Sequence, residues 1–302
     1  MRFVALAGSG GWHMQDLARA AALRGDQFHA GSWRDLSCTL DPSPVVPGAP
    51  IARCGSLVIE QSDALLLRTM PSGSLEQIIF RMDLVQRLSD AGLCVVNPPK
   101  AVEIAVDKHA ASARLLRDGV PTPATFVCQR LDDARAGFAA LGGDVVLKPL
   151  FGSEGFGVMR LTDPQLAERA FAAVERMHSV IYMQRFISHG NSDLRLMVIG
   201  DRVTAAMRRV SDSWRTNIAC GAHGEPYSPD NATIDLALRA SRSCGAMIAG
   251  VDIMVDENTG QSLVIEVNAV PGWRELSRVT GVDVAAQVLD FVHDQATEKL
   301  RG

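Results

Sequence analysis

Three polar residues near the C-terminal end have the types and spacing to hold a divalent cation: Asp252, Glu266 and Asn268. They lie in two apolar runs separated by the turn sequence Asn258-Thr259-Gly260, which predicts a β-hairpin. Side chains alternate between the faces of a strand, so Glu266 and Asn268 point the same way, and Asp252 joins them if the register allows. Two carboxylates and one amide oxygen on a rigid sheet suit a hard cation such as Mg²⁺.

These residues also have an ordinary structural interpretation. Asp252 would cap a turn and Glu266 would pair with an arginine, and either acid taken alone favours that role. However, a carboxylate within so apolar a strand is costly to desolvate unless a cation or a partner charge meets it. The three residues together, followed by Pro271-Gly272, favour the metal site.

A second group of residues has the chemistry of a phosphate site. Lys148 ends a predicted strand and is followed by Gly152, Gly155 and Gly157. Glycines let backbone N–H groups approach phosphate oxygens closely, and the lysine ammonium adds a point charge. The structural alternative is a hairpin loop beside a surface lysine. Because the same chain also contains the acidic hairpin, the two motifs together indicate a nucleoside triphosphate and its Mg²⁺.

Composition limits the classes of protein. The 302 residues suggest about two domains or three small ones, and 47% hydrophobic with 21% charged residues predicts a packed core. The net charge of −4 and the lack of a long basic run argue against nucleic acid as a partner. No apolar run reaches the roughly 18 residues that span a bilayer. Six scattered cysteines and an apolar opening that predicts a strand rather than a signal peptide favour reduced thiols in a cytoplasmic protein.

The first elements predict a Rossmann-like α/β unit. A strand over Arg2–Ala7 is followed by a glycine turn, Gly8–Gly11, and by a helix over Met14–Arg24. The G-x-G-x-x-G spacing is absent, so we expect the turn to line a substrate cleft without binding NAD. Arg68 follows a predicted strand over Ala64–Leu67, where α/β sheets place ligands. It is a candidate for holding an anionic substrate, and a solvated loop arginine is an equally good interpretation.

The rest of the chain predicts alternating helices and strands, with a proline-rich loop over residues 41–50. Helices are expected over Leu75–Ala91, Ala101–Arg117, Asp132–Leu141, Gln165–His178, Thr233–Gly245 and Val282–Leu300. Strands are expected over Cys94–Val96, Thr125–Cys128, Asp144–Leu147, Val180–Met183 and Val203–Met207.

The order of motifs resembles the ATP-grasp ligases of the RimK type over most of residues 97–285. The resemblance implies an α/β and α+β fold, the ATP-grasp fold. It would comprise a Rossmann-like N-terminal domain (1–99), a central lid domain (100–187) and a C-terminal domain with the metal site (188–302), and the last two would clamp ATP. The matching motifs are Asp107-Lys108, Val146-Leu-Lys148, Gly152-x-x-Gly155-x-Gly157-Val158, Met183-Gln184 to Ile187, Asp193-x-Arg195, Arg215-Thr-Asn217, Gly250-Val-Asp252-Ile253, Glu266-Val-Asn268-Ala-x-Pro-Gly272 and Thr280-Gly-Val-Asp283.

The same resemblance implies roles for individual residues. Asp252, Glu266 and Asn268 would hold Mg²⁺, with Mn²⁺ as the alternative metal. Two positions depart from the family pattern: relatives often carry an acidic residue where Arg185 stands, and the bulky Trp273 would reshape the acceptor pocket. The catalytic residues would be Arg195, Arg215 and Asn217. The nucleotide would be bound by Lys108, Lys148, Gly152, Ser153, Gly155, Gly157, Gln184, Arg185, Phe186, Ile187 and Asp193.

The function implied by the resemblance is ATP-dependent amide formation through an acyl phosphate, with release of ADP and phosphate. The loop from Leu67 to Gly73 and the Asn97-Pro98-Pro99 boundary look most like relatives that add glutamate to a coenzyme such as tetrahydromethanopterin. We therefore expect ATP, a small carboxylate acceptor and an amino acid as partners, and the resemblance leaves a homo-oligomer open. The alternatives are RimK-like glutamylation of a protein C-terminus and a non-catalytic ATP sensor.

Overall fold

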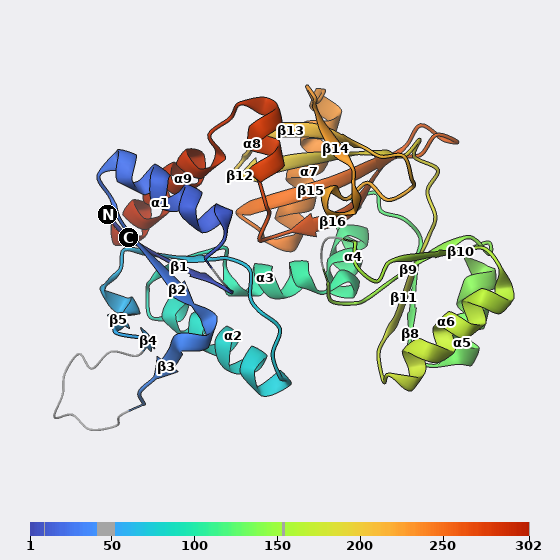
Figure 1. The fold of residues 1–302 in the computed structure, drawn as a ribbon, viewed down its shortest axis with the longest axis horizontal. Helices are drawn as coiled ribbons and strands as arrows, with labels where there is room; N and C mark the ends of the chain where they lie inside the picture. The colour runs from blue at the N-terminus through green and yellow to red at the C-terminus, as the bar shows by residue number, and fades with distance from the viewer. Residues whose placement is uncertain (9, 41–51, 153–154, 302) are drawn as a thin grey trace.

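The computed structural model describes residues 1–8, 10–40, 52–152 and 155–301, arranged around four sheets. Figure 1 shows the N-terminal unit, the lid unit with α5 and α6, and the C-terminal sheet between them. The proline-rich loop over residues 41–50 and the predicted nucleotide ligand Ser153 lie outside the described residues. Within the described ranges, none of the helices combines the length and apolarity needed to cross a bilayer.

The N-terminal sheet is parallel and has the order β2-β1-β6-β7, which confirms the predicted Rossmann-like unit. Along β1, Phe3 and Ala5 join the core that contains α1, whereas Val4 and Leu6 join the core that contains α2. The two helices therefore cover opposite faces, as the period-2 alternation of a strand requires. The elements are β1 (Arg2–Ala7), α1 (Trp12–Arg24), β2 (Gln27–Ser32), β6 (Ala64–Leu67), α2 (Leu75–Asp90) and β7 (Cys94–Val96).

A small antiparallel sheet lies beside this unit, with the order β3-β4-β5. Trp33 and Ile59, in the two short 3₁₀ helices that flank this sheet in the sequence, belong to the α2 core. The elements are η1 (Trp33–Asp35), β3 (Leu36–Cys38), β4 (Ala52–Cys54), β5 (Leu57–Val58) and η2 (Ile59–Gln61).

The lid sheet is antiparallel in the order β10-β9-β11-β8 and carries both of its helices on one face (Figure 1). Val145, Leu147 and Met183 point into the core under those helices. Because strand side chains alternate, Lys148 and Gln184 belong to the opposite, open face. The elements are β8 (Thr125–Cys128), α5 (Leu131–Ala140), β9 (Val145–Lys148), β10 (Met159–Leu161), α6 (Pro164–Arg176) and β11 (Ile181–Arg185).

The C-terminal sheet is antiparallel in the order β14-β13-β12-β15-β16. One face, with Leu196 and Val251, packs with α3, α4 and α7, and the other, with Met197 and Met207, packs in part against α1 and α9. The elements are β12 (Ser192–Ile199), β13 (Arg202–Val210), η3 (Ile218–Cys220), β14 (His223–Pro226), α7 (Asn231–Cys244), β15 (Ile248–Val255), β16 (Ser262–Asn268), α8 (Arg274–Thr280) and α9 (Val284–Arg301).

The single helix predicted over Ala101–Arg117 is wrong, because the chain forms α3 (Pro99–Val106) and α4 (Lys108–Arg117). Asp107 breaks the run with an extended backbone, and its side chain accepts hydrogen bonds from two N–H groups of α4 at 2.9 and 3.1 Å. Both helices pack against the C-terminal sheet. The domain boundaries at residues 99 and 187 remain predictions, although each of the three larger sheets lies within one predicted segment.

Candidate active site

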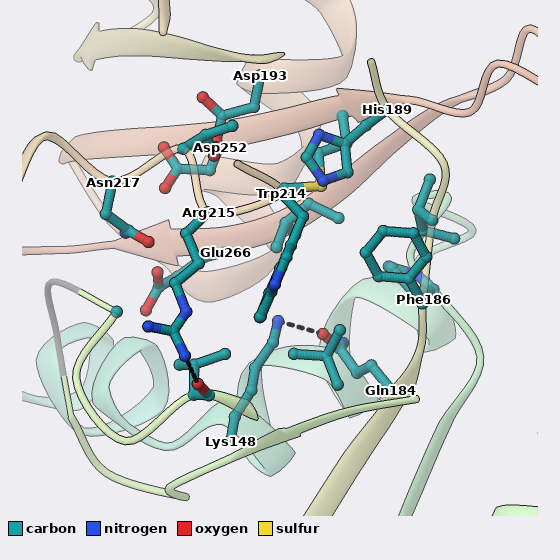
Figure 2. Close-up of a pocket in the computed structure, with 18 of the residues that line it drawn as sticks. Lys148, Gln184, Phe186, His189, Asp193, Trp214, Arg215, Asn217, Asp252 and Glu266 are labelled. Atoms are coloured by element: carbon teal, nitrogen blue, oxygen red, sulfur yellow. Dashed lines mark hydrogen bonds between the residues drawn. The ribbon is translucent and has the colours of Figure 1, made fainter. Parts of the chain in front are cut away.

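The predicted residues gather in a cavity between the open face of the lid sheet and the C-terminal sheet (Figure 2). Its empty volume is about 910 Å³, including the solvent at its mouth, which is within the size of small-molecule sites. Val146 from the lid and Met254 and Ile265 from the hairpin supply apolar walls. Charged side chains line it as well, so the cavity combines apolar surfaces with a polar floor.

The polar floor is a row of charges across the sheet. The register places Asp252 of β15 directly opposite Arg195 of β12 on one side and Glu266 of β16 on the other. Asn268 lies opposite Gly250, two residues along the same strand as Glu266. The hairpin and the shared face expected from the sequence are therefore present.

Asn97 fixes the position of this hairpin. Its side-chain amide donates to the carbonyl oxygens of Ile248 at 2.7 Å and Ala269 at 2.5 Å. Its side-chain oxygen accepts from the N–H groups of Met247 at 2.7 Å and Ile248 at 2.8 Å. One buried residue at the end of the N-terminal unit thus ties down both strands that carry the acidic residues.

The acidic residues have oxygen atoms left for a cation. Asp252 is 5% exposed, and its Oδ1 has no hydrogen-bond partner although Arg195 Nε lies 2.8 Å away, because the N–H direction does not suit a bond. Asn268 Oδ1 accepts one backbone N–H at 2.9 Å, which leaves a lone pair, and the side chain of Glu266 is 32% exposed. Two carboxylates and an amide suit Mg²⁺, which takes its other ligands from water and phosphates.

Three protein donors make an incomplete coordination shell. Within the part of the chain that the structure describes, no cluster of three or more His, Cys, Asp or Glu side chains forms a metal site. The donor set at the hairpin therefore fits an ion that arrives with a phosphate ligand better than an ion held by the protein alone.

Arg209 holds the acidic residues in place. It is 3% exposed and donates to Asp193 through Nε at 2.7 Å and Nη2 at 2.5 Å, while the same Nη2 lies 3.0 Å from Asp252 Oδ2. Thr216 also donates its hydroxyl to Asp193 at 2.7 Å. Burial disfavours the charged guanidinium, but the Asp252 and Asp193 carboxylates outweigh it and raise the pKa of Arg209. The sequence analysis did not single out this residue.

Two lysines lie at the end of the cavity nearest the glycine loop. Lys148 Nζ donates to Gln184 Oε1 at 2.5 Å, and burial lowers the pKa of Lys148 to about 8, with Glu266 opposing the shift. Lys108 Nζ donates to the carbonyl of Gly152 at 2.8 Å and lies 3.9 Å from Glu266 Oε1. Both ammonium groups therefore share the neighbourhood of one carboxylate.

The charges of the lining favour a polyanion. Five cationic side chains face three carboxylates. The cations are Lys108, Lys148, Arg185, Arg209 and Arg215, and the carboxylates are Asp193, Asp252 and Glu266.

The glycine loop meets the loop after β13. Gly155 has a φ of +76°, and a Cβ added there would overlap the side-chain amide of Asn217. Arg215 Nη2 donates to the carbonyl of Val158 at 2.7 Å, so this arginine bridges the C-terminal domain and the lid (Figure 2). Gly157 has a φ of +73° and packs against Pro149 without lining the cavity.

The segment from Arg185 to Ile187 at the end of β11, here called the hinge, also lines the cavity. The N–H groups of Arg185 and Phe186 donate to the carbonyls of Ala124 at 2.8 Å and Asp144 at 3.0 Å, so neither is free to donate to a base. Trp214 meets Phe186 edge to face, with ring centroids 6.2 Å apart. The indole of Trp214 lies among the labelled lining residues in Figure 2, and the sequence analysis assigned it no role.

The structure brings most of the predicted site residues together. Those that line the cavity are Lys108, Lys148, Gly152, Gly155, Gln184, Arg185, Phe186, Ile187, Asp193, Arg215, Asn217, Asp252 and Glu266. Arg195, Asn268 and Gly157 are not among the lining residues, and Ser153 is outside the described residues. Lining residues that were not predicted include His189, Arg209, Trp214, Thr216, Met254 and Ile265. The individual roles of these residues remain predictions.

Comparisons with known proteins show which family and fold this chain resembles. A model of the RimK-like ATP-grasp domain matches residues 105–292. The tetrahydromethanopterin:alpha-L-glutamate ligase of Methanococcus maripaludis is 34% identical over 74% of this chain and 76% of that protein. A probable alpha-L-glutamate ligase of Haemophilus influenzae is 33% identical over 72% of this chain and 74% of that protein. The structure of the ATP-grasp ligase PsnB with a minimal precursor, Mg and ADP is 20% identical and covers 97% of both chains with a TM-score of 0.75, which shows a shared fold.

Proposed function

The chain belongs to the RimK-like ATP-grasp family of ADP-forming carboxylate–amine ligases, and we propose that it uses Mg²⁺ and ATP to add glutamate to a pterin-type coenzyme. The family, the fold class and the ligase class predicted from the sequence are confirmed. The ligase class also sets aside the non-catalytic sensor. The substrates are the proposal, supported by relatives named for glutamate ligation to tetrahydromethanopterin.

One observation carries the proposal for the nucleotide. The acidic hairpin, in which Asp252 Oδ1 is buried without a hydrogen bond, shares a cavity with Lys148 and Lys108 and with the glycine loop. Asp252, Glu266 and Asn268 would hold Mg²⁺, which when bound supplies positive charge to the phosphate oxygens. The two lysines and Arg215 would neutralise the rest of the triphosphate.

The hinge would hold the base. Because the N–H groups of Arg185 and Phe186 are already bonded, base recognition at these two residues falls to their carbonyl oxygens, which accept from an amino group. Val146, Met254 and Ile265 provide apolar surface for the ring. This arrangement matches an adenine, whose exocyclic amine donates.

The proposed reaction needs positioning and charge neutralisation more than a protein nucleophile. An oxygen of the acceptor carboxylate attacks the γ-phosphorus, the bond to the β-phosphate oxygen breaks, and ADP leaves. The amine of glutamate then attacks the acyl carbon, loses a proton, and expels inorganic phosphate. Lys148, Lys108 and Arg215 would hold the phosphate oxygens in line while the closed lid excludes water.

An acceptor panel tests the proposed substrates. ADP release is measured with Mg²⁺, ATP and glutamate in the presence of tetrahydromethanopterin, a simple dicarboxylate, or a peptide with a free C-terminus. We expect ADP release that depends on both glutamate and the pterin, and a product heavier by one or more glutamyl residues. ADP release only with the peptide would show that the acceptor is a protein C-terminus and not the proposed coenzyme.

A further inference from the structure

A second, smaller recess lies at the C-terminal end of β6 in the N-terminal sheet, where Arg68 and Asn97 line it together with apolar residues such as Trp273 and Ile248. The chain leaves β1 through α1 towards β2, and leaves β6 through α2 towards β7 on the other side. The strand order therefore reverses between β1 and β6, and open α/β sheets bind ligands in the crevice at such a point. Arg68 is the residue that follows β6 there, and its backbone N–H donates to Leu6 at 2.8 Å.

Arg68 is a buried cation without a carboxylate partner. Its side chain is 8% exposed, Nη2 donates to the carbonyl of Pro271 at 2.8 Å, and its guanidinium carbon lies 4.5 Å from the centre of the Trp273 ring. None of the ion pairs between described residues includes it. Burial lowers the pKa of Arg68 to about 10. Such a charge is costly in the folded protein unless an anion meets it.

The neighbours of Arg68 do not supply that anion. The His13 ring lies 4.8 Å from the Trp273 ring, and its Nε2 accepts a hydrogen bond from the backbone N–H of Trp273 at 3.0 Å. Burial and the charge of Arg68 lower the pKa of His13 to about 4, so its ring is neutral at pH 7. Asp16, also on α1, already accepts from the Trp273 indole at 2.9 Å and from Arg19 at 2.9 Å. The recess therefore keeps a net positive charge beside the first turn of α1.

This recess adjoins the acidic hairpin. A Cβ added at Gly250 would overlap the guanidinium of Arg195 and come within 3.0 Å of Pro271. Arg195, which pairs with Asp252, and Pro271, whose carbonyl accepts from Arg68, therefore both lie beside Gly250. The proposed metal-binding residues and Arg68 are thus linked through Pro271.

We propose that Arg68 binds a carboxylate of the acidic amino acid substrate, one that does not take part in amide formation. This proposal rests on the proposed function and adds to it the residue that selects an acidic amino acid. A planar guanidinium matches a carboxylate with two parallel hydrogen bonds, and burial strengthens that pair. The Trp273 ring, whose centre lies 4.5 Å from the guanidinium carbon, helps to hold this group in position.

Calorimetric titration with L-glutamate tests the proposal. The protein is first saturated with Mg²⁺ and a non-hydrolysable ATP analogue, and no acceptor is needed. We expect Arg68→Met to weaken glutamate binding at least tenfold while changing affinity for the ATP analogue less than twofold. Arg68→Lys keeps the positive charge but cannot make two parallel hydrogen bonds, so it should bind glutamate with intermediate affinity. Arg87→Met, on the exposed face of α2, serves as the matched control and should bind as the wild type does.

The outcomes separate this proposal from the proposed function. Unchanged glutamate affinity in Arg68→Met would overturn the Arg68 site and leave the ligase assignment in place. Loss of both ligands in Arg68→Met, with a lower melting temperature and no recovery in Arg68→Lys, would show a structural role and also overturn it. A wild-type protein that does not bind glutamate would overturn both the site and the choice of glutamate, without affecting ATP-dependent ligation itself.

Discussion

Arg209 Nη2 lies 3.0 Å from Asp252 Oδ2, while the other oxygen of Asp252 is buried without a hydrogen bond. The buried arginine thus fixes one oxygen of the carboxylate, and the second oxygen faces Arg195 Nε at 2.8 Å without a hydrogen bond. The same guanidinium is hydrogen-bonded to both oxygens of Asp193. One residue that sequence reasoning did not select therefore organises the polar floor of the cavity.

Arg209→Met should destabilise the protein strongly. The substitution leaves Asp193 and Asp252 buried without their shared cation, and breaking a buried pair in this way costs roughly 3–5 kcal/mol. Urea denaturation measures the free energy of unfolding. The neighbouring Arg208, which is exposed, provides the control, and Arg208→Met should change stability by less than about 1 kcal/mol. Equal stability of the two variants would contradict the organising role of Arg209.

Glu266→Gln should preserve the fold and remove most activity. The amide takes away one of the two carboxylates proposed to hold Mg²⁺, so we expect a loss of at least about 100-fold in kcat, or roughly 2.7 kcal/mol. Turnover is measured at saturating Mg²⁺, with circular dichroism as the check on folding. Glu76→Gln, in the exposed first turn of α2, is the control. Turnover near that of the wild type would remove Glu266 from the metal site.

The pKa of Lys148 predicts proton uptake on ATP binding. Burial lowers the pKa of Lys148 to about 8, so at pH 9 the free protein holds this lysine mostly neutral. Bound phosphates favour the charged form and raise the pKa again, so ATP should bind together with a proton at pH 9 and with almost none at pH 6.5. Calorimetry in buffers of different ionisation enthalpy counts the proton. Uptake that persists in Lys148→Met, or that is missing in the wild type, contradicts the assignment.

The same shift predicts how stability changes with pH. The folded-state pKa of Lys148 lies below the value of an exposed lysine, so the unfolded chain binds more protons between about pH 8 and 10.4. The contribution of Lys148 to the free energy of unfolding should therefore rise with pH across that window. This increment is the difference between wild type and Lys148→Met in urea denaturation, and Lys100→Met, at an exposed position, should not reproduce it. A difference that stays flat from pH 8 to 10 would contradict the prediction.

Gly155→Val should lower ATP affinity at least tenfold. The residue has a φ of +76°, and a side chain there would push into Asn217 and displace the glycine loop from the loop after β13. Gly142→Val separates this effect from backbone strain, because Gly142 has a φ of +93° but faces open space. Calorimetric affinity for ATP should fall only in Gly155→Val. Equal affinities in both variants would mean that the contact with Asn217 does not position the loop.

The parts of the site that follow local rules were predictable from sequence. The period of a strand and a turn signal were enough to place Glu266 and Asn268 on one face, and a strand followed by glycines located Lys148. Arg209 was not predictable because its role depends on the register between β12 and β13, which places it opposite Asp193. The break at Asp107 was missed because the apolar pattern continues through it, although aspartate is a strong N-cap.

The burial of Arg68 also lay beyond the sequence. Its position after a buried strand was equally consistent with a solvated arginine and with a ligand-binding one. The contacts with Pro271 and Trp273, which come from the other end of the chain, show that the side chain is buried. The antiparallel strand β14 and the helix α8 were missed for a related reason. Both are short and both pack against β13, so their structure depends on these tertiary contacts and not on a sequence periodicity of their own.

The most direct test of the central claim follows an oxygen atom. The acceptor carboxylate is labelled with heavy oxygen, and the protein is supplied with Mg²⁺, ATP and glutamate. Because the acyl phosphate carries its bridging oxygen away with the phosphoryl group, one labelled oxygen should appear in the released inorganic phosphate, with ADP as the other nucleotide product. Unlabelled phosphate, or the release of AMP and pyrophosphate, would contradict ligation through an acyl phosphate.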